Sequence, residues 1–145
     1  MAVSQVRSNL GRQGDGLPPE LGETAERIER SRAMLDLPPN WDGEGSSAYD
    51  SETWREAVGV VVDASLGFWK SRHEVPPAPW ISKGPEGSVD ILWRRNRRKI
   101  LINVPFGKRA PITFYGNDLD NDRRVVEGSL DPAQPNAWLV GWLTG

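Results

Sequence analysis

Apolar residues in the first part of the chain recur three and four positions apart, the spacing of one face of an α-helix. An amphipathic helix is therefore predicted over 20–36. Pro38-Pro39 follow, and because proline cannot continue a helix, the prediction ends before them. The apolar face of this helix is formed by Leu21, Ala25, Ile28 and Leu35.

A second helix is predicted over 52–71, where a broad apolar face recurs at helical spacing. Asp50 or Ser51 can cap its start by accepting a hydrogen bond from a free backbone N–H group. Gly59 and Gly67 lower the helix propensity. They also belong to a stripe of small residues that allows another element to approach closely.

From Trp80 onward the apolar period changes to two residues, the period of a strand with one buried face. Strands are predicted at 88–94, 99–104, 111–115, 123–128 and 138–143. Residues 95–98 and 117–122 are turn-forming, so the flanking strands should pair as antiparallel hairpins. The sequence predicts an α+β fold with two N-terminal helices packed on one face of an antiparallel meander of four to five strands.

The last predicted strand carries Trp138 and Trp142 on one face, with Val140 between them. Facing inward, these rings would close the sheet against the helices. Facing outward, they would form an apolar patch that marks an interface. Since a small domain needs apolar burial, the core position is favoured.

The 145 residues fit one domain. Residues 1–19 are polar, lack a period and are predicted to form a mobile tail, with 20–145 as a single α+β domain. There is no cysteine, which excludes disulfides and cysteine-based metal sites. Neither a secretion signal nor an apolar run of about 20 residues is found, so a soluble cytoplasmic protein without a membrane partner is expected.

Charge is distributed unevenly along the chain. The net charge is −2, but residues 1–75 carry −5 and residues 76–145 carry +3. The single histidine, His73, follows the second helix without a neighbouring Ser, Cys or Asp in a triad arrangement, so a structural role is expected.

The loop between the two predicted helices combines prolines, glycines and the acidic residues Asp42 and Glu44 around Trp41. Alternating oxygen ligands before a glycine are typical of a calcium loop, but Ser51 stands where such a loop needs its final glutamate, so no metal is expected. The favoured interpretation is that both carboxylates bind backbone N–H groups while Trp41 fills a gap between the helices. The alternative is an acid–base pair of a small hydrolase.

A second acidic run, Asp118, Asp120 and Asp122, also alternates. Arg123 occupies the position where a calcium loop has glycine, and no later glutamate completes the ligand set. A hairpin reversal made of turn-forming residues explains this run with fewer assumptions.

A cluster of cations follows Trp93 at the first predicted hairpin. Such a cluster can follow a phosphate backbone while an aromatic ring stacks on a base. It can equally bind an acidic partner protein, which is favoured because the whole chain is slightly acidic. Charges also collect at hairpin tips simply because nothing is buried there. The cluster consists of Arg94, Arg95, Arg97, Arg98 and Lys99.

Two segments together resemble an uncharacterised family of small bacterial proteins. These proteins carry an LPxNWDGxG-like loop, a proline-rich connector and a GxVxLxW-like strand, which correspond here to 37–45 and 87–93. The resemblance covers roughly residues 20–105, and Asp90 stands where a neutral or amide residue is expected. It implies a shared domain in which the two tryptophan-bearing segments meet, and it implies no reaction.

These observations favour a non-enzymatic protein-interaction module of bacterial or phage origin, such as an antitoxin, immunity protein or accessory subunit, with no cofactor. RNA or DNA binding through the hairpin at 94–99 is the alternative, and a carboxylate-based hydrolase is a third. The residues expected to contact the partner are Trp41, Asp42, Glu44, Trp93, Arg94, Arg95, Arg97, Arg98 and Lys99.

Overall fold

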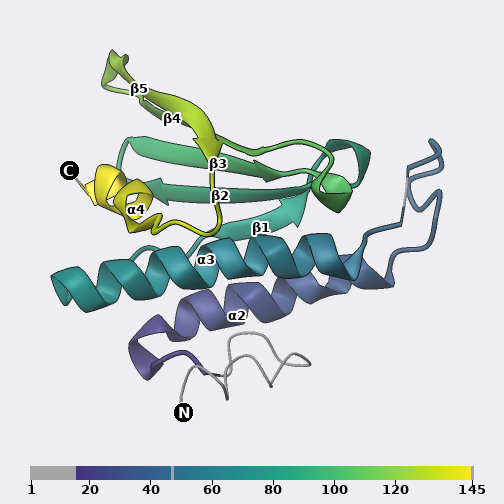
Figure 1. Ribbon diagram of the computed structural model, residues 1–145, viewed down its shortest axis with the longest axis horizontal. Coiled ribbons are helices and arrows are strands. Elements are labelled where there is room, and N and C mark those ends of the chain that lie inside the picture. Colours follow the sequence, from purple (N-terminus) through teal and green to yellow (C-terminus); the bar gives the residue numbers. More distant parts are fainter. Residues whose placement is uncertain (1–15, 47, 145) are drawn as a thin grey trace.

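A five-stranded antiparallel sheet forms one layer of the protein and helices form the other (Figure 1). The computed structural model describes residues 16–46 and 48–144. Neighbours in the sheet are also neighbours in the chain, so the strand order is β1-β2-β3-β4-β5. The fold is therefore α+β with an antiparallel meander, as predicted. The strands are β1 (Trp80–Lys83), β2 (Val89–Arg95), β3 (Arg98–Val104), β4 (Ile112–Asp118) and β5 (Asn121–Leu130).

The predicted helix over 20–36 is divided into three segments. A 3₁₀ turn (Pro19–Leu21) leads into α2 (Gly22–Ser31), and a second 3₁₀ segment (Arg32–Asp36) follows. At the junction, the Ser31 hydroxyl donates to the Ile28 carbonyl (2.7 Å) and accepts from the Trp54 indole N–H (2.9 Å). Of the predicted mobile tail, residues 1–15 lie outside the described residues, and Leu17 packs against the core.

The second helix, α3 (Ser51–Arg72), matches its predicted position. The Asp50 carboxylate accepts from the Thr53 backbone N–H (3.1 Å), so Asp50 is the cap. His73 ends the helix in a left-handed conformation (φ 56°) and donates its backbone N–H to the Trp69 carbonyl.

The helical layer differs in detail from the prediction. The inner face of the sheet is covered by α3 together with a C-terminal helix, α4 (Ala137–Thr144), both of which contact β2 and β3. By contrast, α2 packs against β1 at the edge of the sheet (Figure 1). The prediction that both N-terminal helices pack on the sheet face therefore holds for α3 but not for α2.

The strand predicted at 138–143 is wrong, because this segment forms α4. The segment is almost uniformly apolar, so it carries no reliable period. In the helix, Leu139, Val140 and Leu143 are buried, whereas Trp138 is 49% exposed. The fifth strand is instead β1, which follows the proline-rich connector and had no separate prediction.

The alternation of the sheet strands is as predicted. Val89, Ile91 and Trp93 of β2 point into the core, and so do Ile100, Ile102 and Val104 of β3 and Ile112 and Phe114 of β4. A Cβ atom on Gly67 would lie 3.0 Å from the Cβ atom of Ala137, so Gly67 does allow α4 to approach α3 closely.

Candidate partner-binding surface

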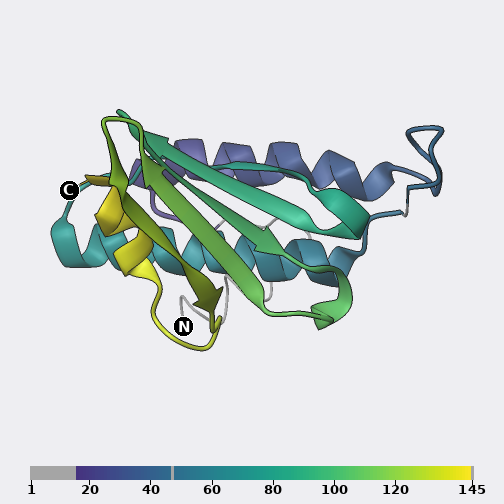
Figure 2. The same ribbon diagram turned by 90° about the horizontal axis from the view of Figure 1, so that it is seen from above.

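The outer face of the sheet has no helix over it among the described residues. Figure 2 views the molecule from this side, with the strands in front and α2 and α3 behind them. An antiparallel sheet can leave one face in water, but the side chains there are then expected to be polar. Part of this face does not follow that rule.

A row of large apolar side chains crosses the outer face. The strand register places Trp80 opposite Leu92, Leu92 opposite Leu101, and Leu101 opposite Tyr115. Trp80 is 46% exposed, Leu101 41% and Tyr115 45%. Since neighbouring strands lie about 4.8 Å apart, the row spans roughly 15 Å. We refer to these four residues as the aromatic row.

The aromatic row is bordered on one side by a polar row and on the other by a basic row. The polar row runs Ser82, Asp90, Asn103, Thr113 and Ser129. Within it, the Asn103 amide donates to the Asp90 carboxylate (2.9 Å).

The basic row runs Arg94, Lys99, Asn117 and Val125. Arg94 is exposed and Val125 is 41% exposed. The outer face therefore has an apolar centre with polar and cationic margins.

At the β1 end of the aromatic row, Arg27 of α2 lies against the Trp80 ring, with its guanidinium carbon 3.4 Å from the ring centroid. The same guanidinium donates to the carbonyls of Ala78 (3.3 Å) and Pro79 (3.4 Å). These contacts fix the Trp80 indole relative to the edge of the sheet.

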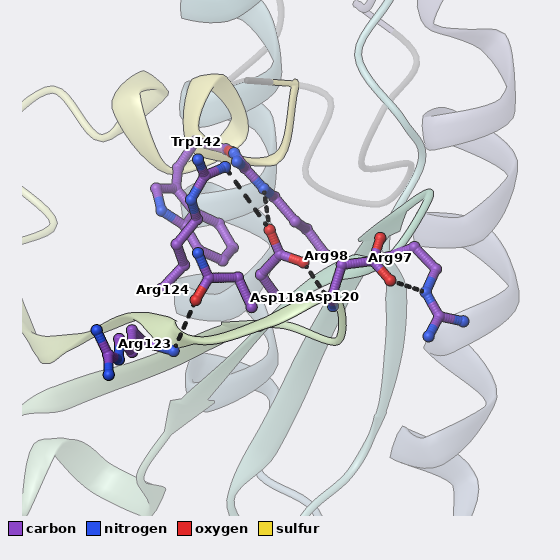
Figure 3. Close-up of polar contacts among 8 residues, drawn as sticks. Arg97, Arg98, Asp118, Asp120, Arg123, Arg124 and Trp142 are labelled. Carbon is purple, nitrogen blue, oxygen red and sulfur yellow. Dashed lines mark hydrogen bonds and ion pairs between the residues drawn. The ribbon is translucent and has the colours of Figure 1, made fainter.

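The basic hairpin between β2 and β3 and the acidic hairpin between β4 and β5 meet at one end of the sheet (Figure 3). Arg97 donates to the Asp120 carboxylate (2.8 Å), and Arg98 donates to that of Asp118 (3.1 Å). The Leu119 backbone N–H also donates to the Arg97 carbonyl (2.8 Å). Two of the five predicted partner-binding cations are thus bound within the protein.

Arg98 also connects this cluster to α4. Its guanidinium donates to the carbonyl of Trp142 and lies 5.1 Å from the centroid of the Trp142 ring. A cation at this position binds a carbonyl that the helix itself leaves free. The Asp120 backbone N–H, followed by Arg98, holds the pKa of the Asp118 carboxyl below its ordinary value.

The loop at 40–46 is closed by its own side chains. The Asp42 carboxylate accepts from the backbone N–H groups of Glu44 (2.9 Å) and Ser46 (3.3 Å) and from the Ser46 hydroxyl. These hydrogen bonds, led by that of the Ser46 hydroxyl, lower the pKa of Asp42. An anionic carboxylate held in this way stabilises the loop, whereas a general acid needs a raised pKa.

Trp41 lies against the turn between β1 and β2. The Lys83 ammonium is 4.4 Å from the centroid of its ring, and the Tyr49 ring centroid is 6.3 Å away. The Tyr49 hydroxyl donates to the Gly84 carbonyl (2.9 Å), and burial raises the pKa of that hydroxyl. The loop therefore rests on the β1–β2 turn, and Trp41 is half-buried.

The remaining predicted contact residues are separated from one another. Trp93 has no exposed surface, and its indole N–H donates to the Pro77 carbonyl (3.0 Å), so its ring is not available to a partner in this fold. Arg95 and Glu44 are exposed. The structure does not bring the loop at 40–46 and the hairpin at 94–99 into one site.

Sequence reasoning missed the aromatic row. Leu92 lies on the outer side of β2 with Asp90 and Arg94, where the alternation of the strand alone predicts polar residues. Leu101 and Tyr115 occupy equivalent positions in β3 and β4. The detectable signal is a single apolar residue on the polar side of each of three consecutive strands.

Within residues 16–46 and 48–144, no three His, Asp or Glu side chains are grouped so that they could hold a metal ion. In the same part of the chain, no helix is both long and apolar enough to cross a membrane. Comparison with known protein families, with curated proteins and with solved structures finds no match to this chain.

Proposed function

We propose that this protein is a non-enzymatic module that binds another protein through the outer face of its sheet. The observation that carries the proposal is the aromatic row, in which Trp80, Leu101 and Tyr115 are each more than two-fifths exposed. Protein interfaces typically have an apolar, aromatic centre and a polar rim. The outer face has this arrangement, with the polar and basic rows as its rim.

The chemistry of the rim indicates what the partner presents. Arg94 and Lys99 lie beside each other in the basic row, and both have their side chains on the outer face. A complementary partner places acidic groups opposite them, which speeds association and suppresses wrong partners. An antitoxin, immunity protein or cytoplasmic accessory subunit would use such a surface to cover or position another protein.

The hydrogen bonds of Asp42 support a binding role over the hydrolase alternative, since this carboxylate is committed to its own loop. The pairing of Arg97 and Arg98 with aspartates weakens the nucleic-acid alternative, because a paired cation has less charge to offer a phosphate.

The test is copurification from native lysate with the wild type and with Leu101→Asp. We expect a stoichiometric partner protein with the wild type and its loss with the variant, because a charge in the apolar centre opposes desolvation. Thr113→Asp, which adds the same charge to the polar row, is the matched control and should retain the partner.

Failure to recover a partner with the wild type, or its retention by Leu101→Asp, would contradict the proposal. Recovery of a nuclease-sensitive species in place of a protein would support nucleic-acid binding. In that case Arg94→Gln with Lys99→Gln should reduce the salt dependence of binding.

A further inference from the structure

The two edges of the sheet are protected very differently. The β1 edge is only four residues long, and Arg27 binds the carbonyls of the two residues before it and lies on Trp80. The β5 strand is ten residues long and pairs only with β4, so its other edge is unpaired in the sheet. Long unpaired edges invite pairing with another chain.

β5 gains little burial inside this fold. Of its ten residues only Leu130 is buried, Val126 is partly buried and the other eight are exposed. Figure 1 shows why, because β5 and the adjoining part of β4 extend away from α2 and α3. An exposed hairpin arm of this kind is expected to be only marginally stable by itself.

β5 has some of the features that protect an edge, namely four charged residues (Asp122, Arg123, Arg124 and Glu127) and a register shift, but lacks others. Its sequence contains neither proline nor lysine. A register shift opposite Asn117 and Asp118 makes the first part of the strand irregular, while Val125 to Leu130 pair regularly with β4. The regular part begins with two valines, which favour strand pairing.

The charges on β5 are complementary under a two-fold axis. Arg123 and Glu127 lie two positions on either side of Val125. The pairing with β4 places Val125 opposite Asn117 and Glu127 opposite Tyr115, so both lie on the outer face, whereas Arg123 lies in the irregular part of the strand. Neither Arg123 nor Glu127 forms an ion pair with another described residue. Arg124, by contrast, is directed toward Asp118 (3.9 Å), and Figure 3 shows Arg123 directed away from that cluster.

We propose that the protein forms a homodimer in which β5 pairs antiparallel with β5 of a second copy, with Val125 at the two-fold axis. In this register Val125 lies opposite Val125 of the other copy, and each Arg123 lies opposite the other copy's Glu127. Opposite charges at directly facing positions stabilise a strand pair.

The pairing joins two five-stranded sheets into one continuous sheet. The outer faces of the two copies then form a single surface that contains both aromatic rows. A partner with two matching sites would bind such a surface with higher avidity than it binds one copy. The dimer does not depend on the function proposed above, since it forms along the edge of β5 and the aromatic row takes no part in the strand pairing.

Charge reversal tests the dimer. Sedimentation velocity over a concentration series should show a dimer for the wild type. In the Arg123→Glu variant, the glutamate at position 123 of each copy faces Glu127 of the other copy. In the Glu127→Arg variant, the arginine at position 127 of each copy faces Arg123 of the other copy. We expect each variant alone to dimerise at least about tenfold more weakly than the wild type. Arg55→Glu, an equal charge change in the second turn of α3, is the matched control and should remain dimeric.

Two combinations of these substitutions make the test specific. An equimolar mixture of Arg123→Glu and Glu127→Arg should form a heterodimer, and the double variant carrying both changes should form a homodimer again. A wild type that stays monomeric at about 100 μM would overturn the proposal. So would single variants that remain dimeric, or a mixture that stays monomeric while circular dichroism shows that both variants are folded.

Discussion

The guanidinium of Arg98 and the carboxylate of Asp118 form an ion pair that is largely shielded from water, with Nε 3.1 Å from Oδ2 and side chains only 16% and 8% exposed. The pair joins two hairpins, and Arg98 adds the carbonyl of Trp142 at the C-terminal end of α4. One side chain therefore connects β3, β4 and α4 (Figure 3). Its neighbour Arg97 makes a similar pair with Asp120, but both of those side chains are more than three-fifths exposed.

Replacing the two arginines should have unequal effects on stability. We expect Arg98→Met to lower the free energy of unfolding by about 2 kcal/mol, because it removes charge-assisted hydrogen bonds and leaves the Asp118 carboxylate without its main cation. Arg97→Met should cost no more than about 0.5 kcal/mol, since an exposed pair is screened by water. Urea unfolding of both variants measures the difference, and equal losses would contradict this assignment.

The Asp118 carboxyl also makes stability depend on pH. Its pKa in the folded protein lies below the ordinary value of 3.8, so the carboxyl contributes stability that is fully present above about pH 5. That contribution is lost as the pH falls through the lower folded-state pKa. The free energy of unfolding should therefore fall less steeply below about pH 4 for Asp118→Asn than for the wild type. Parallel pH curves for the two proteins would count against the assignment.

Two glycines in α3 should respond in opposite ways to alanine. A Cβ atom at Gly59 would meet no heavy atom within 4 Å, so Gly59→Ala should stabilise the protein by about 0.5–1 kcal/mol through helix propensity. At Gly67 a Cβ atom would lie 3.0 Å from that of Ala137 and would push α4 away. Gly67→Ala should be less stable than Gly59→Ala by at least about 1 kcal/mol. Thermal unfolding of the pair provides the measurement, and equal gains would show that α4 moves freely.

The start of α3 depends on Asp50. Its carboxylate accepts from the backbone N–H of Thr53 (3.1 Å) and from the hydroxyl of the same residue (3.0 Å). Asp50→Ala should lower the free energy of unfolding by about 1 kcal/mol, the usual cost of losing a helix cap. Asp50→Asn, which can still accept, should lose much less. Chemical unfolding of both variants tests this, and equal losses would mean that the charge matters and the cap does not.

Features that depend on local spacing along the chain could be predicted before the fold was known. The helical period from Trp54 onward gave α3, and the period of two in β2, β3 and β4 identified the side chains that enter the core. The turn residues gave the hairpins and therefore the meander. Each of these features follows from neighbouring residues in the chain, because a side chain's direction is fixed by the backbone period.

How distant segments pack together depends on contacts that form only in the folded protein. The apolar stretch at 138–143 has no clear period, and it became a helix because Leu139, Val140 and Leu143 can be buried against α3 and the sheet in that form. The sequence offered two candidate partners for the cations of the first hairpin, a nucleic acid and an acidic protein. The pairing of β3 with β4 instead brings two of these cations, Arg97 and Arg98, to Asp120 and Asp118. Leu92, Leu101 and Tyr115 formed a row only through strand register, which depends on contacts between residues far apart in the chain.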